Sequence, residues 1–152
     1  MQLHRITTGI VAAILFCLGC AKLLDSTANH SFFQEPDPVF ALLTNRQLMM
    51  LAGAFEIAVA AFIWREEPVK RRSAAILWFC GLVILYKFGV HLTYDLRPCS
   101  CLGIFGRTLK LSTYQLEQVT WLMLVLFTIV ATFAWAGSLR SGRSVPIPQP
   151  NI

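Results

Sequence analysis

Four long apolar stretches, separated by polar and charged connections, constrain the fold of this chain more than any other feature of its sequence. A stretch of about 20 apolar residues crosses the roughly 30 Å hydrocarbon layer of a bilayer as a helix, because a helix satisfies its own backbone hydrogen bonds there. The predicted spans are residues 6–24, 47–64, 74–96 and 119–139. The sequence therefore predicts an all-α fold, an integral membrane four-helix bundle.

The chain of 152 residues holds four crossings and short connections but no sizeable soluble domain. Residues 1–139 are predicted to form a single transmembrane domain, and residues 140–152, with three prolines, a disordered cytoplasmic tail. A cleaved signal peptide is the alternative interpretation of the first stretch, since Cys17-Leu-Gly-Cys20 resembles a lipoprotein cleavage site. It is disfavoured because a cysteine stands where that site requires leucine.

The basic residues predict the orientation of the bundle, because lysine and arginine are retained on the cytoplasmic side of a membrane. The side that holds both chain ends carries Arg5, Arg65, Lys70, Arg71, Arg72, Arg140 and Arg143. The opposite side carries Lys22, Arg46, Arg97, Arg107 and Lys110. Since residues 65–72 are the densest basic segment, we expect both termini in the cytoplasm. The net charge of +5 follows from this arrangement, and no nucleic-acid partner is expected.

Cysteine placement is the strongest indication of function. Cys99 and Cys101 follow the third predicted span, beside Pro98 and Gly103, on the side opposite the termini. Accessible thiols on the oxidising side of a membrane can form a disulfide or exchange with one, and a bridge across a single residue is strained and therefore labile. We expect Cys99 and Cys101 to be a redox pair. The alternatives are two small residues in a tight turn, or a disulfide to another cysteine.

A second pair, Cys17 and Cys20, stands three positions apart and so shares one face of the first predicted helix, within reach of the outer loop. It could pass electrons to or from Cys99 and Cys101, but a cysteine in an apolar helix often only packs as a small hydrophobic residue. A zinc site made of Cys99, Cys101 and His91 is disfavoured, because zinc-binding cysteine pairs are usually separated by two residues. No metal is expected.

Ionisable residues inside the predicted spans are the other candidates, since charges in a bilayer are costly and usually face the bundle interior. Glu56 and Lys87 lie at depths that one extended lysine side chain can bridge. Lys87, His91 and Asp95 recur at every fourth position and form one polar stripe. Two interpretations stay open: a proton path or quinone-binding wall that serves the thiols, or an interhelical ion pair that fixes packing. Lys22 is expected to extend toward the headgroups without a partner.

Three short motifs are similar to those of a known family: Ala21-Lys-Leu-Leu-Asp25, Glu56 in the second span, and Cys99-Ser-Cys101-Leu-Gly103. Together they resemble the DoxX-like four-helix membrane proteins, in particular the branch typified by the methylamine-utilisation protein MauE. Members of that branch often carry a Cys-Gly-Cys-Phe-Gly segment. The resemblance follows the order of features over residues 6–139.

The match departs from the family at several positions. Ser100 and Leu102 replace the commoner glycine and phenylalanine, and Cys17 and Cys20 are not part of the family pattern. The resemblance implies disulfide formation or electron transfer during maturation of periplasmic proteins, as in methylamine metabolism. It also implies a layout similar to that of quinone-linked thiol oxidases of the vitamin K epoxide reductase and DsbB type.

The sequence thus predicts a multi-pass protein of a bacterial inner membrane that supports thiol–disulfide or electron transfer on the periplasmic face, with thiol–disulfide oxidoreductase activity as a hypothesis. No covalently bound cofactor is expected, and a quinone is the candidate electron acceptor. A periplasmic thiol protein or a membrane complex is the candidate partner. The alternative function is a non-catalytic structural subunit or assembly factor of a membrane complex. A small-solute transporter is disfavoured, since neither an inverted repeat nor a broken helix is visible.

Overall fold

A computed structural model describes residues 2–27, 31–66, 68–93 and 112–141 of the chain. Its elements are α1 (Gln2–Ser26), the short 3₁₀ helix η1 (Ser31–Gln34), α2 (Asn45–Arg65), α3 (Val69–Thr93) and α5 (Thr113–Ser141). α1, α2, α3 and α5 are each long and apolar enough to cross a membrane. The predicted all-α, four-helix membrane fold is therefore confirmed.

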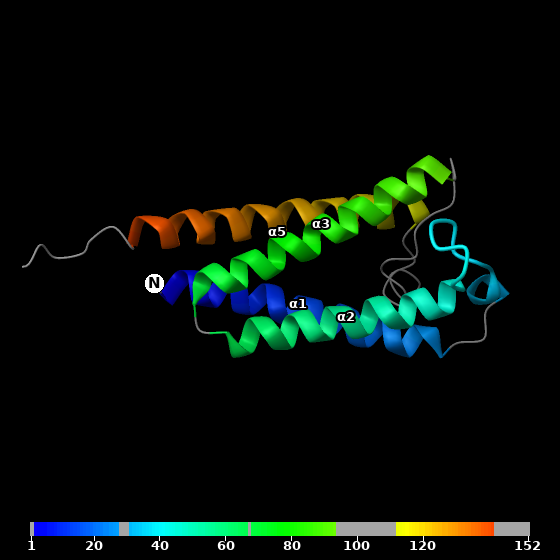
Figure 1. Cartoon of the computed structure of the whole chain (residues 1–152), viewed down its shortest axis with the longest axis horizontal. Coiled ribbons are helices and arrows are strands. Elements are labelled where there is room, and N and C mark those ends of the chain that lie inside the picture. The colour runs from blue at the N-terminus through cyan, green and yellow to red at the C-terminus, as the bar shows by residue number, and fades with distance from the viewer. Residues whose placement is uncertain (1, 28–30, 67, 94–111, 142–152) are drawn as a thin grey trace, which may run out of the picture.

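The four long helices alternate in direction along one axis, which gives the bundle two ends (Figure 1). The end of α1, the start of α2, the end of α3 and the start of α5 make up what we call the loop end. The start of α1, the turn between α2 and α3, and the end of α5 make up the terminal end. Both outer ends of the described chain thus lie at the terminal end of the bundle.

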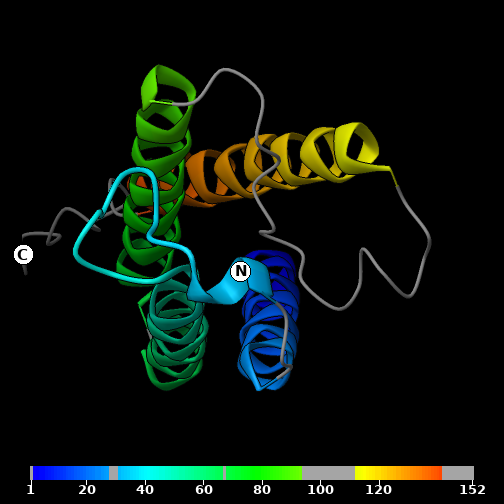
Figure 2. The same cartoon turned by 90° about the vertical axis from the view of Figure 1, so that its right-hand side faces the viewer.

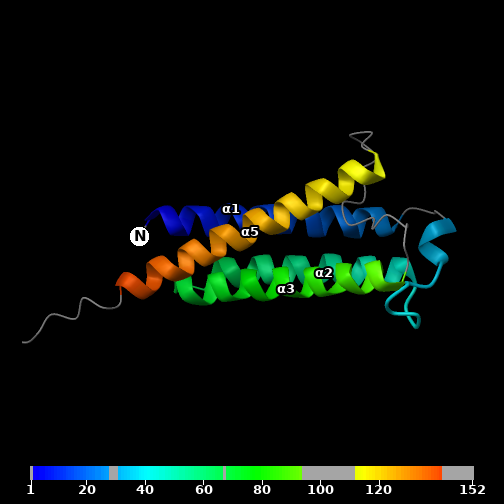
Figure 3. The same ribbon diagram turned by 90° about the horizontal axis from the view of Figure 1, so that it is seen from above.

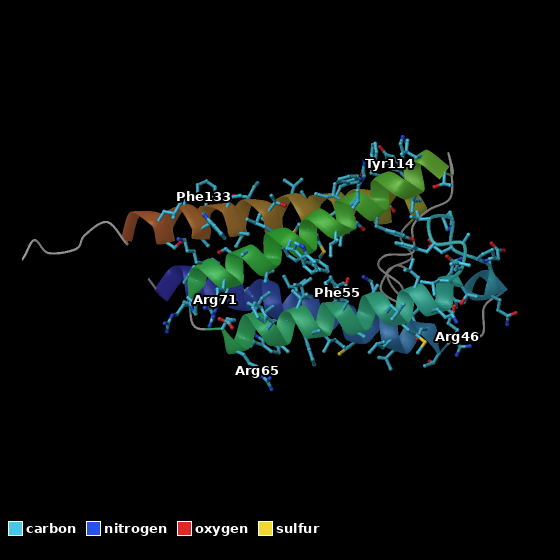
Figure 4. The ribbon with its side chains drawn as sticks, in the orientation of Figure 1. Arg46, Phe55, Arg65, Arg71, Tyr114 and Phe133 are labelled. Atoms are coloured by element: carbon cyan, nitrogen blue, oxygen red, sulfur yellow. The ribbon has the colours of Figure 1, made fainter. Side chains whose placement is uncertain are left out.

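The bundle consists of two closely packed helix pairs, α1 with α2 and α3 with α5. Fewer residues are in contact between the two pairs than within each pair. Figure 3 shows α5 lying obliquely across the other helices. Phe55 of α2, labelled in Figure 4, links the two pairs: its ring centroid lies 5.7 Å from that of Trp78 and 6.1 Å from that of Phe79, both on α3.

The tightest approach in the bundle is between α1 and α2. A Cβ atom at Gly19 would lie 2.7 Å from the Gly53 carbonyl oxygen, and a Cβ at Gly53 would lie 2.9 Å from the Gly19 carbonyl oxygen. Helices in lipid associate through close van der Waals packing, because lipid chains are as apolar as the side chains they replace. The two glycines therefore allow backbone contact that larger residues would prevent.

An apolar core runs from the middle of the bundle toward the terminal end. Every long helix contributes three buried residues to it. They are Val11, Ala12, Leu15, Val59, Ala60, Ile63, Ile76, Phe79, Cys80, Leu124, Phe127 and Ala131. Large side chains on the outer helix faces are exposed, such as Phe133 at 71%, which Figure 4 shows on α5. This is the distribution that lipid on the outside of a bundle permits.

Two helices start with the same capping arrangement, which extends them beyond the predicted spans. The Gln47 N–H donates to Thr44 Oγ1 at 3.3 Å while Gln47 Oε1 accepts from the Thr44 N–H at 3.0 Å. Ser112 and Gln115 repeat this box at 3.3 and 2.9 Å. Residues 113–118, predicted as a polar connection, therefore belong to α5, whose helical backbone also includes residues 140 and 141 of the predicted tail.

The turn at the terminal end is shorter than predicted, so α3 begins at Val69. Arg71 pairs with the Glu66 carboxylate at 3.3 Å, and the Arg72 guanidinium donates to the Glu66 carbonyl oxygen. Both arginines therefore lie in the first turn of α3, which the prediction had assigned to a connection. Residues 94–96 of the third predicted span, and residues 142–152 of the predicted tail, lie outside the described residues.

Residues 35–45, from the end of η1 to the first residue of α2, form a tight loop, which we call the 35–45 loop. Backbone hydrogen bonds join the Asp37 N–H to the Leu43 carbonyl at 2.8 Å and the Asn45 N–H to the Glu35 carbonyl at 2.9 Å. Seen from the loop end, the 35–45 loop lies beside α3 on the side away from α1 (Figure 2). It therefore closes back on the bundle instead of leading away from it.

Candidate functional site

Buried charge among the described residues is concentrated from the middle of the bundle to the loop end. The charged residues that are less than one tenth exposed are Asp25 (3%), Asp37 (2%), Glu56 (4%) and Lys87 (7%). Because ionised groups in a bilayer are costly and are usually retained for a function or a specific partner, this half of the bundle is the candidate functional site.

An ion pair between α1 and α2 is its central feature. The Lys22 ammonium donates to Glu56 Oε1, and the two side chains are 12% and 6% exposed. The pair lies against the glycine contact: a Cβ at Gly19 would lie 3.2 Å from the Glu56 Cβ, and one at Gly53 would lie 3.2 Å from the Lys22 Cβ. The close approach of the two backbones therefore sets the acid and the base side by side.

This pairing corrects two predictions. Lys22 does not extend toward the headgroups without a partner, because its ammonium is held by Glu56. The partner of Glu56 is not Lys87. Depth along the spans does not specify which helix faces which, and α2 packs far more extensively against α1 than against α3.

The second oxygen of the Glu56 carboxylate is a further polar feature. Oε2 is buried and receives no hydrogen bond from any of the described residues. An unpaired acceptor in an apolar interior costs free energy. A proton or a hydrogen-bond donor that reaches this oxygen is therefore bound favourably. It gives the interior of the α1–α2 pair one available acceptor.

Lys87 lies in the other helix pair, between α3 and α5. Its ammonium is 5.1 Å from the centroid of the Trp121 ring, a distance at which a cation and an aromatic face attract. Glu117, one turn before Trp121 on α5, is close enough to interact with Lys87 electrostatically. Lys87 is thus accommodated by an aromatic face and a nearby carboxylate.

The predicted polar stripe on the third span is only partly internal. His91, one turn beyond Lys87, is exposed, and Asp95 lies outside the described residues. The described part of the stripe therefore does not extend the buried charge of Lys87 toward the end of α3.

Cysteines at the loop end are placed only in part. Cys17 is exposed and Cys20 is half-buried on α1, and both are free thiols. Cys20 precedes the end of α1 by six residues, about 9 Å along the helix axis. Cys99 and Cys101, the predicted redox pair, lie outside the described residues.

The helix ends on either side of the cysteine segment are described. α3 ends at Thr93 and α5 begins at Thr113, both at the loop end. Within the described residues, no group of three His, Cys, Asp or Glu side chains is arranged to hold a metal.

Two residues of this half were not among the sequence candidates. Asp37 Oδ1 accepts hydrogen bonds from the Val39 and Phe40 N–H groups at 2.9 and 2.8 Å, and Oδ2 accepts one from the Tyr86 hydroxyl at 2.8 Å. The Pro-Asp-Pro sequence at 36–38 carried a signal, since an aspartate in a turn often binds the backbone two residues on. Nothing in the sequence indicated that Tyr86 would reach it from α3.

Comparison with protein-family models, with curated proteins and with solved structures gave no match. The resemblance to DoxX-like proteins accordingly stays a hypothesis that rests on the short motifs. What the four apolar helices do establish is a multi-pass membrane protein that has a lipid bilayer as its surroundings.

Proposed function

We propose that this membrane protein supports thiol–disulfide or electron transfer at the loop end of its bundle, with Cys99 and Cys101 as the reacting pair. The main support for this proposal is that the elements such a reaction needs lie at the same end of the bundle. The two helix ends that flank the cysteine segment, Thr93 and Thr113, lie at the same end of the bundle as the buried charged groups and the α1 thiols.

The proposed reaction moves electrons and protons together. In the direction that matures exported proteins, two thiols of a partner become a disulfide while the Cys99–Cys101 disulfide takes up two electrons and two protons. A quinone in the bilayer then accepts two electrons and two protons, restores the disulfide and becomes a quinol. Cys17 and Cys20 are the candidate second pair for a relay between these steps.

The polar interior supports such a role because each cycle transfers protons as well as electrons. Glu56 offers one buried carboxylate oxygen with no donor from the described residues, next to the Lys22 ammonium. Lys87, held over Trp121, adds a second buried cation on the same half of the bundle. We propose that these groups shape the interior that serves the thiols.

We also propose how the bundle is oriented in its membrane and to which family the chain belongs. The loop end faces the periplasm and the terminal end faces the cytoplasm of a bacterial inner membrane, as the basic residues Arg65, Lys70, Arg71 and Arg72 favour. The Ala21–Asp25, Glu56 and Cys99–Gly103 motifs favour membership of the DoxX-like group, MauE branch. A periplasmic thiol protein is the proposed partner.

Thiol trapping in intact cells tests the reaction. A membrane-impermeant maleimide is added with and without prior reduction, and labelled peptides are resolved by mass spectrometry. We expect Cys99 and Cys101 to react only after reduction, and the Cys99→Ser/Cys101→Ser variant to lose the oxidation of exported thiols. The matched control is Cys80→Ser, because Cys80 is buried in the apolar core and takes no part in the reaction.

Two results would end the proposal. One is full activity of the double serine variant together with stable co-purification of a membrane complex, the outcome that a structural subunit predicts. The other is a reporter fused to the C-terminus and found active only outside the cytoplasm, since it would place the loop end on the reducing side.

A further inference from the structure

The 35–45 loop carries an apolar tip that the proposed function does not use. Phe40 is 49% exposed and Leu42 is 100% exposed. A fully exposed leucine is common on a mobile surface loop, but this loop is extensively hydrogen-bonded. The tip is therefore a fixed apolar surface.

The hydrogen bonds that fix the tip come from within the loop and from α3. The Leu43 N–H donates to the Phe40 carbonyl at 2.7 Å, so the chain turns sharply between them. Asp37 accepts the Val39 and Phe40 N–H groups from inside the turn and the Tyr86 hydroxyl from α3. The carboxylate thus orders the tip and ties it to the membrane-spanning helix.

Packing sets the height of the tip along the bundle. The Phe40 ring stacks on the Tyr86 ring at a centroid distance of 6.3 Å and an interplanar angle of 2°. A Cβ at Gly89 would lie 3.2 Å from the Val39 side chain. Tyr86 and Gly89 lie about 10 and 6 Å below the end of α3 at Thr93, by the 1.5 Å rise per residue. The tip is therefore level with the last turns of a membrane-spanning helix.

The same turns of α3 present apolar side chains to the outside. Leu85, Phe88 and Leu92 are 66%, 59% and 73% exposed. In a helix that crosses a bilayer, such side chains face lipid. The loop that carries the tip lies beside α3 (Figure 2), and its contacts with Tyr86 and Gly89 set it at the level of these side chains. The apolar surface of the tip continues the lipid-facing surface of α3.

We infer that the tip, residues 39–42, is an anchor inserted into the leaflet at the loop end, with Phe40 and Leu42 among the lipid chains just below the headgroups. The occupant of this surface is phospholipid. Arg46 follows in the first turn of α2, is exposed and lies at the loop end in Figure 4, where it can reach the phosphates. This inference does not depend on the proposed redox function.

The anchor is tested by comparing the labelling rates of single introduced cysteines, with the protein in nanodiscs of phosphatidylethanolamine and phosphatidylglycerol. Leu42→Cys is compared with Gln34→Cys, an exposed position at the end of η1, and with Phe133→Cys on the lipid-facing side of α5. A membrane-impermeant maleimide is the probe, and mass spectrometry of each peptide separates the new thiols from the native ones. Leu42 makes no packing contact that its replacement would remove, so the variant folds.

We expect the cysteine at position 42 to react at least about 10-fold more slowly than the cysteine at position 34. Its rate should be closer to that of the cysteine at position 133. Equal rates at 42 and 34 would put the tip in water and overturn the inference. A second measurement separates lipid from protein. In Leu42→Trp, lipids brominated on their upper acyl carbons should quench the added fluorescence, whereas slow labelling without quenching would mean that a protein surface or a second copy covers the tip.

Discussion

The core half of the bundle, from its middle toward the terminal end, and the half toward the loop end are built from the same four helices but bury different groups. In the core half, twelve apolar residues pack together, and every long helix supplies three of them. In the loop-end half, the described chain buries three pairings that bridge elements: Lys22 with Glu56, Lys87 with Trp121, and Asp37 with Tyr86. The core half is therefore held by apolar packing, and the loop-end half by specific pairs of polar or charged groups.

The difference matters because the two kinds of burial respond differently to change. Apolar packing weakens gradually as atoms are removed, since each lost contact is small. A buried charge loses far more when its one partner disappears, because the remaining ion stays in a low-dielectric interior. We therefore expect the loop-end half to be sensitive to partner identity and the core half to be sensitive to volume.

The largest expected effect comes from separating the ion pair. Lys22→Met should lower the free energy of unfolding by about 3 to 5 kcal/mol, because Glu56 is left buried without a counter-ion. Glu56→Gln should have a similar effect through Lys22. Steric trapping in bicelles measures it. The Lys22→Met/Glu56→Met double variant should be closer to wild type than either single change, and additive losses would show that the two residues do not act as a pair.

Volume in the apolar half gives the next effect. Ile63→Ala should destabilise the bundle by about 3 kcal/mol, because Ile63 is fully buried in the core and its removal leaves a cavity. The same unfolding assay measures it. Leu122→Ala is the matched control, since Leu122 is 69% exposed on α5 and its loss should change stability little. Equal effects at the two positions would contradict the assignment of the core.

The glycine contact adjoins the ion pair in the loop-end half. Gly53→Ala should cost about 2 kcal/mol, because the added methyl group would meet the Gly19 carbonyl oxygen at 2.9 Å and force the helices apart. Gly81→Ala, where no atom lies within 4 Å of the added Cβ, is the control and should be neutral or slightly stabilising. If Gly53→Ala were as well tolerated, the α1–α2 approach would be looser than described.

The smallest expected effect is local. Tyr86→Phe removes the hydroxyl that donates to Asp37 and should destabilise the attachment of the 35–45 loop by about 1 kcal/mol. Amide hydrogen exchange should quicken at Val39 and Phe40 and stay unchanged in the core of α3. The Tyr86→Leu variant, which removes the aromatic ring as well as the hydroxyl, should lose more protection than Tyr86→Phe if stacking on Phe40 contributes as well.

Sequence patterns predicted the four spans because a bilayer requires long apolar helices, whichever partners they find. Helix boundaries were less accurate. The predicted start at residue 119 missed the Ser112–Gln115 capping box, in which a polar residue pattern starts the helix six residues earlier at Thr113. Apolar content alone underestimates a helix whose first turn extends into the polar interface.

The sequence predicted which charged residues of the candidate site are buried, but not which partners they contact. Glu56 and Lys87 were expected to be buried because of their depth in the spans, and both are. Their partners, Lys22 and Trp121, depend on the rotation of each helix about its axis and on which helices are neighbours. The spacing of residues along one chain does not contain that information.

By itself, the sequence determined that this protein is a membrane-spanning helical bundle, because the length and polarity of each stretch decide whether it can cross lipid. Only the tertiary structure decided that α1 pairs with α2, that Lys22 turns inward to Glu56, and that Asp37 ties its loop to Tyr86. The physical reason is that crossing lipid is a property of one helix, whereas pairing a buried charge depends on the packing of two.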